Sequence, residues 1–319
     1  MRKIIFIALA FLLSGSLITF ADQGVEQSPS TARASKIDQA LEAKGEYRQK
    51  LRELVTIEKE EQPQQVESYV RWMPKRRAKN QDGNVGVVDA ALEYSYMYKA
   101  FGKLPIQFGL QTGNISLNNS TSVKLPAHLT SLAAGVEVTA PFFTLDKTYL
   151  RVGVYPAFYS DNYSFHSSAF RIPSRFMGIW QPNDQWTWVL GVAVMPDFNP
   201  TCVPIFGFIY KPSDKLEFNI VPSRPTITYK LNDKFSIFAE GGITSGEYEV
   251  GQNGNKGLIL EYNESHVGGG LKYQVNKNIK ASLSAGGMFG RSLEYREDVN
   301  GKVALKGGPY TELRVEIGI

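Results

Sequence analysis

Histidine and serine are the residues of this chain whose types and spacing could support hydrolytic chemistry. Of the three histidines, His166 lies two residues before Ser168, His266 directly follows Ser265, and His128 lies near the end of a predicted strand. A serine whose proton is taken by a histidine is the nucleophile of many esterases and lipases. Residues this close in sequence have no inherent tendency to form such a pair in a strand. We therefore predict no catalytic residues and no enzyme, and a lipid hydrolase is the least favoured functional alternative.

Neither a metal ion nor a phosphate-bearing cofactor is predicted. A zinc site needs converging His, Cys or carboxylate ligands, and the sequence has no closely spaced cluster of these residues. The glycines at 268–270 and 286–287 lie within predicted strands, whereas a phosphate-binding loop precedes a helix. The sequence therefore indicates no cofactor.

Alternation of apolar and charged side chains is the dominant pattern from residue 85 onward. Val88 and Leu92 share one face of the segment 85–99, while Asp89 and Glu93 share the other. About a dozen segments alternate in this way, which predicts strands with one apolar and one polar face. The residues predicted to face the lumen of a closed sheet are Glu93, Lys99, Glu137, Arg151, Arg171, Arg175, Glu217, Lys230, Glu240, Lys272, Lys280, Arg314 and Glu316.

Opposed charges on an enclosed face allow two interpretations. They can line a water-filled pore, or they can pair across a lumen that side chains fill. For a barrel of about 12 to 14 strands we favour a narrow channel.

A recurring phrase marks the turns between these strands. The copies WQPND, YKPSD, YKLND and YQVNK each place an aromatic residue shortly before a polar turn, and the next strand begins at once. Tight turns of this kind join antiparallel neighbours, so these turns lie at one end of the sheet. Aromatic rings at strand ends are typical of membrane interfaces. The predicted interface aromatics are Tyr98, Trp180, Tyr210, Tyr229 and Tyr273.

The connections at the other end are predicted to be longer, at 112–128, 246–257 and 296–308. A soluble sandwich would bury the apolar face between two sheets, whereas a transmembrane barrel would turn it toward lipid around a polar lumen. The asymmetry of the connections and the aromatics beside the turns favour the barrel. A closed sheet also supplies a partner for every backbone N–H and C=O in hydrocarbon. The predicted fold is all-β: a closed antiparallel transmembrane β-barrel of about 12 to 14 strands, with a short N-terminal helical extension.

The strand count leaves one ambiguity. About 13 strands fit between residues 86 and 319, but bacterial barrels of one chain have even numbers. Either the segment 66–73 (VESYVRWM) is a first strand, which gives about 14, or one strand is split wrongly and there are about 12. The predicted domains are a signal peptide at 1–21, a polar and partly helical periplasmic segment and linker at 22–84, and the barrel at 85–319.

The N-terminal region differs in composition from the rest of the chain. Residues 1–21 have a basic start, an apolar run at 4–13 and small residues before a polar stretch, which predicts export by a signal peptide. Capping and apolar periodicity predict a helix over about 35–60. A basic cluster follows that could meet anionic lipid or lipopolysaccharide phosphate, although such runs are usually solvated loops. Its members are Lys75, Arg76, Arg77 and Lys79.

Composition excludes several classes of protein. With 319 residues, of which 43% are hydrophobic and 21% charged, the chain is too polar for a bundle of membrane helices and too apolar for a disordered chain. No apolar run long enough for a transmembrane helix follows the predicted signal peptide. The formal net charge of +4 is small, so nucleic acid is not a predicted partner. Cys202 is the single cysteine, which excludes an intramolecular disulfide.

The segment 196–242 resembles a bacterial outer-membrane β-barrel family of unassigned function. The resemblance rests on the run PIFGFIY at 204–210 with Pro212, on Pro222 and Tyr229, and on the glycine pair at 241–242. It extends over about 85–319 and implies an outer-membrane barrel. It implies no reaction, because that family has no catalytic motif.

The C-terminal segment resembles the terminal strand that outer-membrane assembly machinery recognises. Leu313, Val315, Ile317 and Ile319 alternate with polar residues as in those signals, which more often end on Phe. The predicted location is therefore the outer membrane after export. We predict a narrow pore or solute-binding channel, with a structural or surface-interaction barrel as the alternative. The predicted partners are outer-membrane lipid and lipopolysaccharide, the assembly machinery and small solutes.

Overall fold

A computed structural model describes residues 63–100, 104–142, 145–161, 167–196, 198, 200–222, 224–252, 255–296 and 301–319. The predicted signal peptide, the predicted helix over about 35–60 and His166 lie outside these residues. None of the helices in the described ranges is long and apolar enough to cross a membrane.

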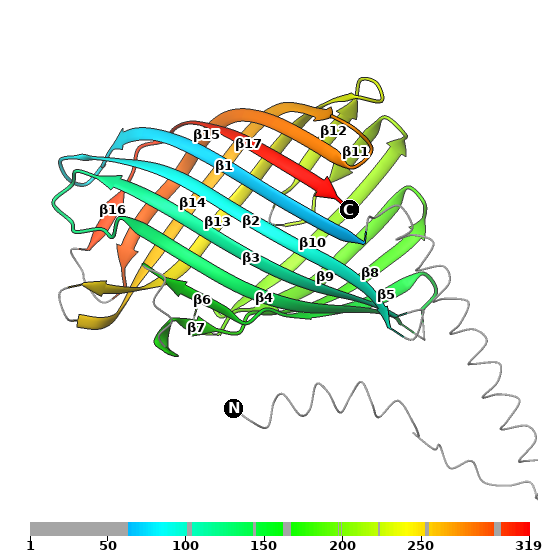
Figure 1. Ribbon diagram of the computed structural model, residues 1–319, viewed down its shortest axis with the longest axis horizontal. Coiled ribbons are helices and arrows are strands. Elements are labelled where there is room, and N and C mark those ends of the chain that lie inside the picture. The colour runs from blue at the N-terminus through cyan, green and yellow to red at the C-terminus, as the bar shows by residue number, and fades with distance from the viewer. Residues whose placement is uncertain are drawn as a thin grey trace, which may run out of the picture. The chain divides into compact units, whose positions relative to one another are not determined.

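The described part of the chain forms one sheet that closes on itself (Figure 1). Its strands are β1 (Gln64–Arg77), β2 (Asn84–Ala100), β3 (Leu104–Asn119), β4 (His128–Pro141), β5 (Thr148–Val154), β6 (Ala157–Ser160), β7 (Phe170–Arg171), β8 (Ser174–Asn183), β9 (Trp186–Val194), β10 (Cys202–Ser213), β11 (Leu216–Asn219), β12 (Thr226–Lys230), β13 (Phe235–Gln252), β14 (Asn255–Gln274), β15 (Ile279–Tyr295), β16 (Lys302–Ala304) and β17 (Gly308–Gly318). A single 3-10 turn in the described ranges, η2, covers Ser167–Ala169.

Consecutive strands pair in antiparallel fashion around the whole sheet. Three pairs of strands, β5 with β6, β7 with β8 and β16 with β17, are each the two parts of one interrupted strand. β17 pairs with β1 along Gln65–Trp72 and closes the ring. The result is a closed antiparallel barrel of 14 strands, which confirms the predicted fold class and the larger of the two strand counts.

The barrel begins earlier than the predicted boundary at residue 85. β1 starts at Gln64 and is hydrogen-bonded to β2 on one side and to β17 on the other. Without β1 the edges of β2 and β17 would be open, which is costly for a barrel in lipid. The boundary was therefore wrong, and the alternative that made 66–73 a first strand is confirmed.

The outer face of the barrel is apolar. Every second side chain along a strand points outward, and on most strands these side chains are large and apolar. Exposed large apolar residues occupy this face on nearly every long strand, whereas a sandwich would bury them. Among them are Val70, Trp72, Val88, Leu92, Phe108, Leu110, Leu132, Val136, Leu150, Phe176, Leu190, Phe206, Ile237, Ile243, Val267, Leu271, Leu283, Phe289 and Leu313. We call this surface the apolar belt.

Much of two loops predicted at the long-loop end, 112–128 and 246–257, is strand. β3 runs to Asn119, and β13 and β14 form one long hairpin that reaches Gln252 and Asn255. The Asn, Gly and Ser residues of these segments resemble turn residues, but pairing with adjacent strands keeps the segments extended. The wall formed by β13–β15 and β1–β3 is therefore tall, while β11 and β12 have only four and five residues.

At the long-loop end the tall wall closes on itself in a second, narrower ring. β13 crosses to β6, where Glu249 and Ser160 pair in parallel. The Asp161 amide donates to the Glu249 carbonyl at 3.0 Å, the Gly251 amide donates to an Asp161 carboxylate oxygen at 3.1 Å, and the Ser168 hydroxyl donates to the Glu249 carboxylate at 2.6 Å. Tyr159 of β6 also makes an edge contact with the Tyr248 ring, with centroids 5.8 Å apart. We call these contacts the β6–β13 seam.

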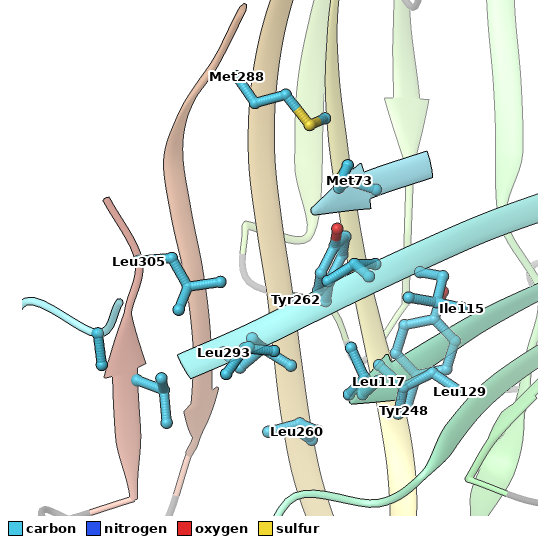
Figure 2. Close-up of a cluster of buried hydrophobic side chains, with 14 of the residues drawn as sticks. Met73, Ile115, Leu117, Leu129, Tyr248, Leu260, Tyr262, Met288, Leu293 and Leu305 are labelled. Atoms are coloured by element: carbon cyan, nitrogen blue, oxygen red, sulfur yellow. The ribbon is translucent and has the colours of Figure 1, made fainter. Parts of the chain in front are cut away.

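An apolar cluster fills the interior of this narrow ring (Figure 2). Its side chains come from β1–β4 and β13–β17 and are almost completely buried. The cluster contains Met73, Ala78, Val85, Val87, Ile115, Leu117, Leu129, Tyr248, Val250, Leu260, Tyr262, Met288, Leu293, Tyr295, Val303, Leu305 and Tyr310. The polar inner face expected along the whole barrel is therefore apolar at the long-loop end.

Candidate lumen site

The predicted lumen residues lie on the strand face opposite the apolar belt. Glu93 follows Leu92, Arg151 follows Leu150 and Lys272 follows Leu271, and these leucines point outward. The same alternation holds for the other predicted residues. Arg171, Glu240 and Arg314 are buried by neighbouring side chains, and the remaining residues are at least partly accessible to water.

A buried ion-pair network crosses the middle of the lumen. Arg71 of β1 is its centre, only 4% exposed, with nitrogen–oxygen distances of 2.7 Å to Glu312, 3.2 Å to Glu264 and 4.0 Å to Asp89. Arg314 lies 2.8 Å from a Glu312 oxygen. Each charge has a partner of opposite sign, which is the condition for holding ions away from bulk water.

Arg224 enters this network from the connection between β11 and β12. Its guanidinium lies 2.6 Å from Glu240, 3.5 Å from Glu312 and 4.0 Å from Glu67, so it links β13 to β17 and β1. The Tyr310 hydroxyl donates to the other Glu240 oxygen at 3.2 Å. We call the set Glu67, Arg71, Asp89, Arg224, Glu240, Glu264, Arg291, Glu312 and Arg314 the charge network.

A second polar group lies on the wall formed by β4, β5 and β8. The Tyr155 hydroxyl donates to Glu137 at 2.5 Å, Arg151 lies 3.5 Å from Glu137, and Arg175 stacks over the Tyr155 ring at 4.9 Å. Gly153 makes room for that ring, because a Cβ there would lie 2.4 Å from the Tyr155 hydroxyl oxygen. Glu137 and its two arginines remain partly accessible, so they form a charged surface that a solute could contact.

The predicted interface aromatics lie on the outer face beside the short turns. Tyr98, Trp180, Tyr229 and Tyr273 are exposed near the ends of β2, β8, β12 and β14. Tyr210 is half-buried because its ring stacks on Trp186, with centroids 4.1 Å apart. The rings therefore lie at one end of the apolar belt.

Of the histidines considered from sequence, His166 lies outside the described residues, and His266 forms no pair with Ser265. His266 is 5% exposed, its two ring nitrogens have no hydrogen-bond partner among the described residues, and its ring meets the edge of Tyr310. Ser168 is engaged by Glu249. The structure instead places Ser116 and His128 on adjacent strands, with Oγ and Nδ1 3.2 Å apart. Sequence reasoning missed this pair because the two residues meet only through β3–β4 pairing.

Several members of the charge network were also missed. Asp89, Glu264 and Glu312 share the inner face by simple alternation, so the pattern contained the signal. Arg71 lies on the strand that the predicted boundary left out, and Arg224 lies in a connection where alternation does not apply. Within the described ranges, His, Cys, Asp and Glu residues form no group that could hold a metal ion.

A closed β-barrel with an apolar outer belt and a charged, partly plugged lumen is the class that this geometry defines. The chain matches DUF6268, a domain of unknown function, over residues 116–311, which is more than half of its length. The protein therefore belongs to the DUF6268 family. No curated protein matches the chain.

Solved structures of similar fold include outer-membrane proteins. A crystal structure of an outer-membrane channel from Pseudomonas putida F1 is 13% identical, covers 81% of this chain and 95% of its own, and has a TM-score of 0.43. The NanC porin is 13% identical, with 80% and 100% covered and a TM-score of 0.38. A deletion mutant of TodX, a monoaromatic hydrocarbon channel, is 10% identical, with 81% and 91% covered and a TM-score of 0.41.

Proposed function

We propose that this protein is an outer-membrane barrel that binds small solutes in its lumen and passes them through a narrow route. One observation carries the proposal: the sheet closes into a ring around a charged inner wall while its outer face is an apolar belt. Lipid on the outside and water with ionised groups on the inside account for both faces. A soluble monomer would rarely expose so large an apolar surface.

The short-turn end is the proposed periplasmic end, because outer-membrane barrels have short periplasmic turns and longer extracellular loops. The accessible lumen residues Glu93, Glu137, Arg151 and Arg175 belong to the half of the lumen nearest this end. Solutes with polar or ionised groups would bind first at that charged wall.

The straight route beyond the charge network is closed in this structure. The β6–β13 seam narrows the barrel, and the apolar cluster fills the ring behind it. We therefore expect the wild-type protein to conduct ions only weakly. A wide, permanently open pore does not fit this geometry.

The environment and partners follow from the same proposal. We expect the protein to be exported, inserted by the outer-membrane assembly machinery, and surrounded by outer-membrane lipid and lipopolysaccharide. The outward basic residues Lys75 and Arg77 lie near the long-loop end of β1, where lipopolysaccharide phosphate would be within reach.

Ion selectivity in planar lipid bilayers tests the function. Neutralising the lumen with Glu93→Gln and Glu137→Gln together should shift the reversal potential toward anion selectivity, since both carboxylates face the accessible lumen. Asp82→Asn is the matched control, because Asp82 lies in the exposed β1–β2 connection. A mature wild-type protein that shows neither conductance nor solute binding would contradict the proposal.

A lipid hydrolase is the second candidate function, because the structure brings one Ser–His pair together. Ser116 and His128 lie on the outer face near the long-loop end, and the Ser116 hydroxyl is also 3.0 Å from the Asn114 side-chain oxygen. The ester bonds of outer-leaflet lipids would be the substrates. Loss of esterase activity in both Ser116→Ala and His128→Ala would support this candidate, and activity in neither the wild type nor the variants would exclude it.

A further inference from the structure

The barrel wall contains a notch between β10 and β13. β10 pairs with β9 along Cys202–Tyr210, but its pairing with β11 is limited to Ile209, Tyr210 and Ser213. β13 pairs with β12 only along Ser236–Glu240. In the described part of the chain, the edges 202–207 of β10 and 242–246 of β13 therefore have no strand neighbour on the side where they face each other.

The described residues of the connection between β11 and β12, 220–222 and 224–225, form the floor of the notch. The Ile220 amide donates to the Phe208 carbonyl at 2.7 Å, and the Gly241 amide donates to the Pro225 carbonyl at 3.0 Å. No described residue continues this pairing along 202–207 of β10 or 242–246 of β13, and the next pairing on that side of β13 is Glu249 with Ser160. From the same connection, Arg224 extends inward and joins the charge network.

The notch lies at the height of the apolar belt. It begins about three residues beyond the interface aromatic Tyr210 and runs for about six residues, or roughly 20 Å along the strand. With the usual strand tilt, this distance corresponds to about 15 Å across a belt that is typically about 25 Å tall. Phe206 and Ile243, which flank the notch on the outer face, are 63% and 74% exposed.

Unpaired strand edges in hydrocarbon are costly, because no water is present to satisfy their N–H and C=O groups. Such backbone is tolerated at membrane depth where it borders a cavity that water or a solute can enter. The lumen lies directly behind this notch, since Arg224 and Glu240 are members of both the floor region and the charge network.

We propose that the notch is a lateral portal through which amphipathic solutes move between the lumen and the outer leaflet. The polar group of such a solute would be held beside the charge network while its apolar body passes between β10 and β13. Because the apolar cluster closes the route along the barrel axis, a solute in the lumen needs a passage through the barrel wall. This inference rests on the proposed function, because it requires solutes to enter the lumen.

A cross-link across the notch tests the portal. In a Cys202→Ser background, Phe206→Cys and Ile243→Cys would be joined by bis-maleimides of increasing length. The matched control joins Leu283→Cys to Leu313→Cys, because these residues are register partners on adjacent strands and are 62% and 54% exposed. The assay measures transfer of the amphipathic probe N-phenyl-1-naphthylamine into vesicle lipid, together with ion conductance of the same samples.

We expect the bridged notch to slow probe transfer at least tenfold, while the bridged control transfers at the unbridged rate. Unchanged transfer with the notch bridged would overturn the portal, and intact conductance in that sample would leave the proposed function standing. Absence of conductance, binding and transfer in every sample would instead refute the proposed function.

A single-cysteine variant covers the case in which the two edges cannot be bridged. In the Cys202→Ser background, Ile243→Cys alone should react with a lipid-soluble maleimide and should not form a covalent dimer in membranes. A covalent dimer would show that a second copy covers the edges, which would overturn the portal. A failure of Ile243→Cys to react with the maleimide would also overturn the portal, because the edge of β13 would then be covered.

Discussion

Removing Arg71 should destabilise the barrel more than any exposed charge can. Its guanidinium is the shared partner of Glu312, Glu264 and Asp89 and is 4% exposed. Breaking a buried ion pair typically costs about 3–5 kcal/mol, since the remaining charge is left buried without a partner. Arg71→Met keeps most of the apolar stem, so the loss reports mainly on the charge.

The remaining partners of the three carboxylates narrow the expected loss of unfolding free energy. Glu312 keeps Arg314 at 2.8 Å and Arg224 at 3.5 Å after the substitution, so it remains compensated. Glu264 keeps only Arg291 at 3.9 Å as a cationic partner, and Asp89 keeps the Tyr69 hydroxyl at 3.1 Å. We therefore expect the free energy of unfolding to fall by about 3 kcal/mol, the lower end of the range.

The assay is urea unfolding in lipid vesicles, followed by the fluorescence of the four tryptophans. Arg77→Met is the control, because its ion pair with Asp82 is exposed and should contribute at most about 1 kcal/mol. Adding Glu264→Gln to Arg71→Met should recover part of the loss, since it removes a buried carboxylate whose remaining cationic partner is 3.9 Å away. An Arg71→Met loss no larger than that of Arg77→Met would refute the view that the charge network holds the lumen together.

Three further outcomes follow from other parts of the barrel. Asp161→Ala with Ser168→Ala removes two of the seam's hydrogen bonds and should raise conductance in planar bilayers, whereas Ser122→Ala, in an exposed connection, should not. Leu271→Arg places a charge on the apolar belt and should lower the free energy of unfolding from vesicles by about 2–4 kcal/mol, while Thr228→Arg on the inner face should change it far less. Gly153→Val should cost about 1–3 kcal/mol in the same assay, because its Cβ would collide with the Tyr155 hydroxyl, and Tyr155→Ala should relieve that cost. Equal effects of each variant and its control would contradict the corresponding assignment.

Alternation and turn chemistry were sufficient to predict the barrel. The outward positions of Val88, Leu92 and Leu271 follow directly from their spacing, because a strand repeats every two residues. The aromatic residues before polar turns predicted that one end of the barrel has short turns, and Tyr98, Trp180 and Tyr273 lie at that end. These features depend on local sequence alone.

Contacts between distant segments could not be predicted in this way. Ser116 meets His128, and Arg224 meets Glu240, only after strand pairing fixes which residues are neighbours. The apolar filling of the narrow ring was missed for the same reason, since Val85 and Val87 read as ordinary strand residues until the seam encloses them. Which residues line the lumen depends on how the sheet closes, and closure depends on pairing between strands that are far apart in the sequence.

The closed long-loop end and the open notch have a single structural cause. β12 begins only at Thr226 and leaves residues 242–246 of β13 without a neighbour on the β12 side, so β13 is free to bend toward β6. A β12 as long as β13 would pair with residues 242–246 and hold Glu249 away from Ser160. It would fill the notch and widen the narrow ring at the same time. The short strands β11 and β12 therefore account for both the narrow ring and the notch.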